Sequence, residues 1–321
     1  MREEDSMRIV FMGTPEFSVP ILSQLITNEY DIVAVYTQPD RPQGRGRRLI
    51  PSAVKQEALK HHLEIQQPAK LRETTAQLYL TELHPDIIIV ASYGQILPQQ
   101  ILDIPRFGCL NVHPSLLPLY RGSSPISTAI LNGDSETGVT IMLMDAGLDT
   151  GHILTQTSIA IETTDTSTAL ASRLAIIGAR LLIDTIPGWI NNQIQPVPQD
   201  NTRATHTRTI SKQEGKIDWN LSAVEIWRQV RAFQPWPGSY TSWQNKVFKI
   251  IDAFPIESHD NDREPGTIIA INNISGTYAG VITGKGVLAL QQVQLEGKRP
   301  VSISDFLKGH KDFIGTRLGE Q

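Results

Sequence analysis

Residues 86–91 read Asp-Ile-Ile-Ile-Val-Ala, an apolar run with no polar residue after its first position. A strand that is apolar on both faces is typical of the middle of a parallel sheet covered by helices. Similar runs occur at residues 8–12, 31–36, 108–112 and 137–144. Stretches with helical spacing lie at residues 16–27, 52–63, 71–83, 125–132 and 166–187. Because strands alternate with helices, we predict an α/β domain with a doubly wound, mostly parallel, Rossmann-like sheet.

The pattern changes after this domain. Residues 191–210 are rich in Asn, Pro and Thr and have no apolar period, so they predict a linker. One helical stretch follows at 222–234, and then short runs punctuated by glycine at 246–251, 267–271, 278–283 and 287–293. Short strands at close spacing predict a small β-barrel. The expected division is an extension at 1–6, the α/β domain at 7–190, the linker at 191–210 and the barrel domain at 211–321.

Composition excludes several classes of protein. The chain has 321 residues, 40% hydrophobic and 19% charged, and a net charge of −4, which argues against bulk non-specific binding of nucleic acid. No apolar run is long enough for a membrane span, and the acidic start at residues 1–6 predicts a disordered extension without a signal peptide. The single cysteine fits a reducing cytoplasm, and no zinc spacing of Cys and His occurs, so we expect no metal. Nothing requires more than a monomer.

Asn111 and His113 stand two residues apart at the end of an apolar run. Side chains at this spacing on a strand share a face, and open α/β sheets place their sites at the carboxyl ends of strands. An amide can hold an oxyanion and an imidazole can move a proton, so the pair predicts acyl-type transfer. The alternative is an Asn that caps a turn beside a surface His.

Residues 144–152 read MDAGLDTGH and form a loop after a predicted strand. Asp149 could orient His113 and stabilise its charged form, and Asp145 and His152 are the competing candidates from the same loop. The structural alternative is a turn in which the aspartates bind backbone amides. Cys109 shares the face of Asn111 but lies deeper in the sheet, so we expect a buried thiol.

Residues 39–51 read PDRPQGRGRRLIP, a loop with one acid and four arginines. Guanidinium groups on a flexible loop suit phosphate backbones, which makes candidates of Arg41, Arg45, Arg47 and Arg48. A solvated loop is the alternative. The turn Gly13-Thr14-Pro15 lacks the three glycines of a dinucleotide-binding fingerprint, which argues against NAD.

Four segments together resemble the 10-formyltetrahydrofolate-dependent formyltransferases: MRIVFMGTPEF at 7–17, PDIIIVA at 85–91, NVHPSLLPLYRG at 111–122 and DAGLDTG at 145–151. The resemblance implies 10-formyltetrahydrofolate as the formyl donor and chemistry that needs no metal. It also implies that the catalytic Asn, His and Asp fall on Asn111, His113 and Asp149. The folate-binding residues of the family would fall on Ser115, Leu116, Leu117 and Pro118.

Two further features resemble the branch of this family that acts on tRNA: the GRGRR insertion at 44–48, and EGKIDW at 214–219 with RAFQPWPG at 231–238. They imply an OB-like C-terminal domain that binds tRNA, an insertion-loop contact at Arg45, and the methionine α-amine of initiator methionyl-tRNA as acceptor in translation initiation. Three alternatives remain: a sugar-nucleotide N-formyltransferase, a formyltetrahydrofolate hydrolase, and an RNA-binding module with an inert α/β domain.

Overall fold

The structure is a computed structural model that describes residues 7–43, 48–257, 263–274 and 277–319. The chain divides into two compact units. The first comprises Met1–Pro125, Glu136–Ala160 and Leu170–Thr207, and the second comprises Ile126–Ser135, Ile161–Ala169 and Arg208–Gln321. The extension predicted at residues 1–6 lies outside the described residues.

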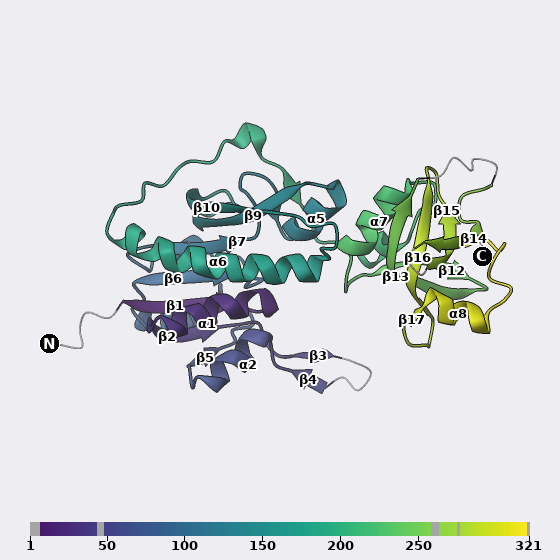
Figure 1. Ribbon diagram of the computed structural model, residues 1–321. Coiled ribbons are helices and arrows are strands. Elements are labelled where there is room, and N and C mark those ends of the chain that lie inside the picture. The colour runs from purple at the N-terminus through teal and green to yellow at the C-terminus, as the bar shows by residue number, and fades with distance from the viewer. Residues whose placement is uncertain (1–6, 44–47, 258–262, 275–276, 320–321) are drawn as a thin grey trace. The chain divides into compact units, whose positions relative to one another are not determined.

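The first unit is built on one seven-stranded sheet in the order β10-β9-β7-β6-β1-β2-β5 (Figure 1). Its strands are β1 (Arg8–Gly13), β2 (Asp31–Tyr36), β5 (Ile65–Gln66), β6 (Ile87–Ala91), β7 (Cys109–His113), β9 (Glu136–Leu143) and β10 (His152–Ala160). Neighbours from β7 to β5 pair in parallel, whereas β9 and β10 join antiparallel. This confirms the predicted mostly parallel sheet. Strand β10 was not predicted, because its buried and exposed positions alternate as on a half-exposed edge strand.

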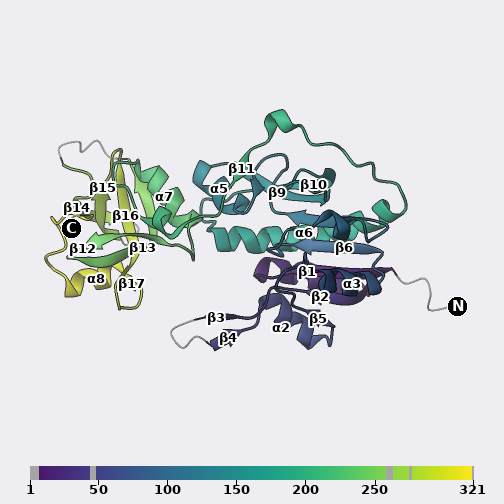
Figure 2. The same cartoon turned by 180° about the vertical axis from the view of Figure 1, so that it is seen from behind.

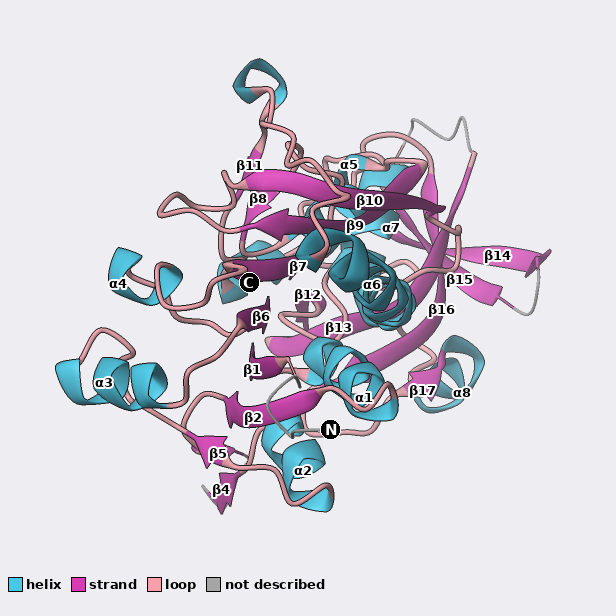
Figure 3. Ribbon diagram, turned by 90° about the vertical axis from the view of Figure 1, so that its left-hand side faces the viewer, coloured by secondary structure: helices cyan, strands magenta, loops and turns pink. Residues whose placement is uncertain are grey.

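Helices cover both faces of this sheet. They are α1 (Val19–Thr27), α2 (Ala53–Lys60), α3 (Thr74–Glu82), α4 (Gln99–Leu102) and α6 (Ser167–Ile190). Figure 3 shows α1 and α6 against one face and α3 and α4 against the other. A Cβ on Gly178 of α6 would lie 2.9 Å from Val112 Cγ1, so glycine allows this helix to approach β7 closely. In the described part of the chain, no helix is long and apolar enough to cross a membrane.

Two short ribbons complete the first unit. Strands β3 (Arg41–Gln43) and β4 (Arg48–Ile50) form an antiparallel hairpin in the arginine-rich loop. Strand β8 (Arg121–Gly122) pairs in parallel with β11 (His206–Thr207).

Residues 191–207, which we call the return segment, differ from the linker that their composition predicts. After α6 the chain runs past the edge strand β10, as Figures 1 and 2 show, and Val197 forms an antiparallel bridge with Ile153 of that strand. It then pairs through β11 with β8. Backbone pairing therefore fastens this segment to β10 and β8, and the segment belongs to the first unit.

The second unit contains a six-stranded sheet in the order β12-β13-β16-β15-β14, with β17 also paired to β16. The strands are β12 (Ser239–Trp243), β13 (Lys246–Ile256), β14 (Ile268–Ile274), β15 (Thr277–Ile282), β16 (Val287–Leu295) and β17 (Val301–Ser302), and all the pairs are antiparallel. Helices α7 (Ala223–Ala232) and α8 (Ile303–Gly309) accompany them, and α5 spans Pro125–Asn132. The predicted C-terminal domain of short strands is confirmed.

Aromatic rings fill the core of the second unit. Trp243 packs edge-to-face on Phe306 and Phe313, with ring centroids 5.6 and 5.1 Å apart. Phe248 is fully buried and contacts the same two rings. Such edge-to-face pairs add to the stability gained by burying the rings.

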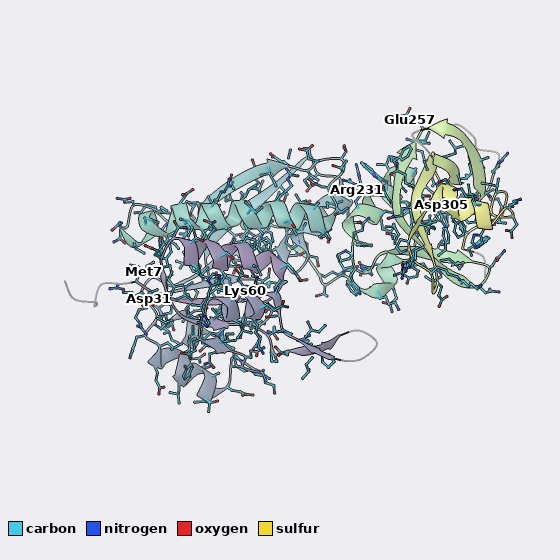
Figure 4. All side chains as sticks on the ribbon, turned by 60° about the horizontal axis from the view of Figure 1, so that its bottom comes forward. Met7, Asp31, Lys60, Arg231, Glu257 and Asp305 are labelled. Carbon is cyan, nitrogen blue, oxygen red and sulfur yellow. The ribbon has the colours of Figure 1, made fainter. Side chains whose placement is uncertain are left out.

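Arg231, labelled in Figure 4, explains why residues 161–169 belong to the second unit. Its Nη1 donates to the backbone oxygens of Glu162 and Asp165, each at 3.2 Å. Its Cζ lies 3.9 Å from the centroid of the Trp227 ring, in a cation–π contact. The motif that resembled a tRNA-specific tail thus begins with a packing residue.

Candidate active site

Strand β7 presents the first two candidate residues. Asn111 and His113 lie at its carboxyl end on one face, while Val112 between them packs toward α6. Asn111 is half-buried, and His113 is only 4% exposed. The prediction that the pair shares a face at a strand end is therefore confirmed, and the surface-His alternative is wrong.

Asp149 joins this pair from the loop after β9. Its Oδ2 accepts a hydrogen bond from the Gly122 amide at 2.7 Å and lies 3.7 Å from His113 Nδ1. Its Oδ1 lies 3.5 Å from Asn111 Nδ2, at the long limit of a hydrogen bond. The carboxylate is thus held by a backbone amide between the two polar side chains of β7.

Histidine 113 has distinct roles available at its two nitrogens. Nε2 lies 3.1 Å from the backbone oxygen of Tyr120, and because a carbonyl only accepts, Nε2 is the donor. Nδ1 is then the nitrogen that gains or loses a proton. Burial lowers the pKa of His113, while the Asp149 carboxylate and the Tyr120 carbonyl raise it. Burial has the larger effect, so the pKa of His113 is lowered and its neutral form is favoured, although the Asp149 carboxylate lies beside it.

The competing residues are placed elsewhere. Asp145 Oδ1 accepts from the Gly147 amide at 3.0 Å and from Thr150 Oγ1 at 2.6 Å, so this carboxylate stabilises its own loop. His152 is an exposed residue at the start of β10. Cys109 is buried, which raises the pKa of its thiol to about 12 and makes it a poor nucleophile.

A cavity of about 400 Å³ opens beside the three residues. Its wall contains Asn111, His113 and Asp149, and it continues along two loops, residues 92–97 after β6 and residues 144–149 after β9. Ile96 and Leu148, both exposed, add apolar surface to this wall. A cavity with apolar walls and a few polar groups at one end suits a flat organic ligand.

The predicted folate contacts do not line this cavity. The lining does not include Ser115, Leu116, Leu117 or Pro118. Ser115 is fully buried and its Oγ donates to the Leu119 oxygen at 2.6 Å. The Leu117 amide donates to Thr140 Oγ1 at 3.1 Å, and the Leu117 oxygen accepts from Gln156 Nε2 at 2.8 Å. The amide and the oxygen of Leu117 therefore fasten this turn to β9 and β10.

A second cavity, of about 500 Å³, adjoins the first and shares Ser92, Tyr93 and Gly94 with it. Its remaining lining comes from the turn after β1, residues 38–41, and residues 50–56. Arg41 lies in this wall, on the β3–β4 hairpin. Arg48 lies on β4, while Arg45 and Arg47 fall outside the described residues.

Two groups at the site were missed from the sequence. The Gly122 amide and the Tyr120 carbonyl hold Asp149 and His113, yet neither residue type suggests chemistry. Gly122 has φ of +108°, and a Cβ there would lie 2.3 Å from the Thr207 oxygen, so only glycine fits at this position of β8 beside β11. The one sign in the sequence was Gly122 itself, because a glycine is the residue type that a positive φ and a close backbone contact require.

The sequence comparisons agree over almost the whole chain. Residues 7–186 match the formyl transferase family, and residues 209–311 match the formyl transferase C-terminal domain. The chain is 44% identical over 313 residues to a methionyl-tRNA formyltransferase of Hydrogenovibrio crunogenus, covering 98% of this chain and 99% of that protein. It is 45% identical to the methionyl-tRNA formyltransferase of Pseudoalteromonas translucida, covering 98% of each.

Solved structures share the fold at low identity. WlaRD, a sugar 3N-formyl transferase, superposes with a TM-score of 0.64 at 21% identity, covering 92% of this chain and 99% of that one. HypX from Aquifex aeolicus, solved with tetrahydrofolic acid, gives 0.65 at 16% identity, covering 97% of this chain and 48% of its own. With both family matches and the full-length relatives in agreement, the chain belongs to the formyl transferase family.

Proposed function

We propose that this enzyme transfers a formyl group from 10-formyltetrahydrofolate to the α-amine of methionine esterified to initiator tRNA. The observation that carries the proposal is the convergence of Asn111, His113 and Asp149 at the end of one cavity. The full-length relatives, which are methionyl-tRNA formyltransferases, support the choice of acceptor.

The reaction forms one C–N bond and breaks another. The neutral α-amine attacks the formyl carbon, the bond from that carbon to N10 of the folate breaks, and the proton lost by the amine is balanced by one gained at N10. The carbonyl oxygen becomes an oxyanion on the way. We assign Asn111 Nδ2 as the donor to that oxygen, and one such preorganised donor is typically worth ~3–4 kcal/mol.

His113 handles the proton through Nδ1, because Nε2 is tied to the Tyr120 carbonyl. Asp149 faces Nδ1 at 3.7 Å and stabilises the charged imidazole as the proton arrives. Since the Gly122 amide fixes the carboxylate, the pair is aligned before the substrates bind.

We place the folate in the cavity that contains the three catalytic residues. Its exposed apolar residues, Ile96 and Leu148, suit the aromatic rings of the donor. In this assignment Ser115, Leu116, Leu117 and Pro118 act indirectly, as a rigid turn that fixes the end of β7. The adjoining cavity, which contains Arg41 and shares Tyr93, would receive the methionyl end of the tRNA.

The tRNA itself would be held by arginines of the β3–β4 loop and by the second unit. Asp40, the only acid of residues 39–51, lies just before β3 and forms an ion pair with Lys55 Nζ at 2.7 Å. In the second unit, a cavity of about 400 Å³ combines Lys212 and Lys249 with Tyr240. Cations beside an aromatic ring suit a phosphate backbone with an adjacent base.

The test is a transfer assay with labelled 10-formyltetrahydrofolate and three acceptors: methionyl-tRNA, a sugar-nucleotide amine and water. We expect label in methionyl-tRNA with a kcat/KM at least ~10²-fold above that for the sugar amine. The reason is that a small acceptor lacks the phosphate backbone that the arginine loop would contact. Preferential formylation of the sugar amine, or release of formate alone, would contradict the proposal.

A further inference from the structure

The return segment brings one buried amide to the back of the catalytic loop. Gln199 is 9% exposed and comes from the stretch that composition predicts as a linker. Its Nε2 donates to the backbone oxygens of Asp149 at 2.9 Å and Gly151 at 2.7 Å. Both donors of the side chain are therefore used on the loop that contains the catalytic carboxylate.

Arg121 fixes the other half of the same side chain. The Gln199 oxygen accepts from Arg121 Nε at 3.0 Å and from Nη2 at 2.9 Å, and Nη2 also donates to Asn201 Oδ1 at 2.8 Å. Arg121 is 3% exposed. The amide cannot be reversed, because its NH₂ would then face the guanidinium and its oxygen would face two carbonyls.

Asp149 needs such support because of its backbone. Its φ is +53°, in the left-handed region, which residues with a Cβ adopt uncommonly. Conformations of this kind persist when neighbouring groups hold them. Gln199 holds the backbone oxygen of Asp149, while the Gly122 amide holds its carboxylate.

We propose that Gln199 is a positioning residue, which, with Arg121, holds the Asp149 loop so that the carboxylate faces His113. The inference rests on the proposed function for its catalytic consequence. It does not rest on that function for its structural consequence, which is the placement of a negative charge beside His113 Nδ1.

Gln199→Glu removes the hydrogen bonds that this side chain donates and keeps those that it accepts. Glutamate has the same shape and still accepts from Arg121, so the buried guanidinium keeps its partner. It cannot donate, and its second oxygen would face the carbonyls of Asp149 and Gly151. We expect the loop to shift, and because a displacement of about 1 Å in an active site can cost 10²-fold in rate, kcat should fall by about that factor.

The discriminating readout is the titration of His113, followed by NMR of the labelled imidazole. Asp149 raises the pKa of His113, so its displacement lowers that pKa. The new charge of Gln199→Glu would by itself raise the pKa, so a fall cannot come from that charge. Gln195→Glu is the matched control, since Gln195 is exposed on the same segment and acquires the same charge. Gln199→Met repeats the test without any added charge.

We expect the His113 titration to move to lower pH, and kcat to fall, in Gln199→Glu and Gln199→Met. In the control Gln195→Glu, the titration and kcat should both stay as in the wild type. An unmoved titration in folded Gln199→Met, where no added charge opposes the shift, overturns the inference, even where kcat falls, because the change in rate would then reflect general loosening. The proposed function fails separately, if the wild-type enzyme does not formylate methionyl-tRNA while the titration still moves.

Discussion

Replacing Asp149 with Asn removes the charge that faces His113 and leaves a side chain of the same shape. The Gly122 amide can still donate to the new amide oxygen, so the loop keeps its main contact. Asp149 Oδ2 and His113 Nδ1 are 3.7 Å apart, with side chains 13% and 5% exposed. At an effective dielectric of about 20, two unit charges at this distance attract by about 4 kcal/mol.

That energy stabilises the charged imidazole that forms as the amine loses its proton. At about 1.4 kcal/mol for each tenfold in rate, its complete loss would reduce kcat by roughly 10³-fold. The amide dipole retains part of the attraction, so we expect a fall of about 10²- to 10³-fold. The pH profile should move as well. Asp149 raises the pKa of His113, so without it the pKa falls and the acidic limb of kcat/KM moves to lower pH.

Single-turnover formylation of methionyl-tRNA across the pH range measures both effects. Asp145→Asn is the matched control, because it removes the same charge from the same loop, where Asp145 binds Gly147 and Thr150. Its acidic limb should stay in place. An Asp149→Asn enzyme with a rate within a few-fold of wild type, or with an unmoved limb, would refute the role given to this carboxylate.

Three other substitutions test separate parts of the structure. Asn111→Ala should reduce kcat by about 10²-fold or more while folate affinity, measured by fluorescence titration, is mostly kept; an unchanged kcat would exclude the oxyanion role. Arg41→Ala should raise the KM for charged tRNA without altering folate affinity, and wild-type tRNA binding should weaken as salt rises; equal KM values would remove Arg41 from the tRNA site. Phe248→Ala should lower the free energy of unfolding by about 3–5 kcal/mol in urea titration, and a loss below ~1 kcal/mol would contradict its place in the aromatic core.

Local patterns were sufficient for five strands of the sheet and for two proposed catalytic residues. The apolar run of β6 identified a central strand, and the spacing of Asn111 and His113 placed both on one face of β7. These features depend only on strand periodicity, which is visible in any short window of sequence. Asp149 needed the family resemblance, because spacing alone left Asp145 and His152 as alternatives.

The remaining features depend on contacts between residues far apart in the sequence. Composition made residues 191–210 look like a linker, since Asn, Pro and Thr are common both in free chains and in segments that hydrogen-bond to a neighbour. The family resemblance assigned the Ser115–Pro118 turn to folate, but the contacts of this turn could not be predicted, because its partners Thr140 and Gln156 lie on strands that come later in the chain. Arg121 and Gln199 were missed for the same reason, being 78 residues apart.

The return segment also sets the order in which the enzyme becomes active during synthesis. Gln199 leaves the ribosome 50 residues after Asp149, so a nascent chain can complete the seven-stranded sheet while the Asp149 loop still lacks these hydrogen bonds. Residues 126–135 and 161–169 likewise pack in the second unit, and the rest of that unit, from residue 208 onward, is synthesised after them. A chain that ended between residues 190 and 199 would therefore contain the whole sheet and α6 but lack the hydrogen bonds from Gln199 to the Asp149 loop.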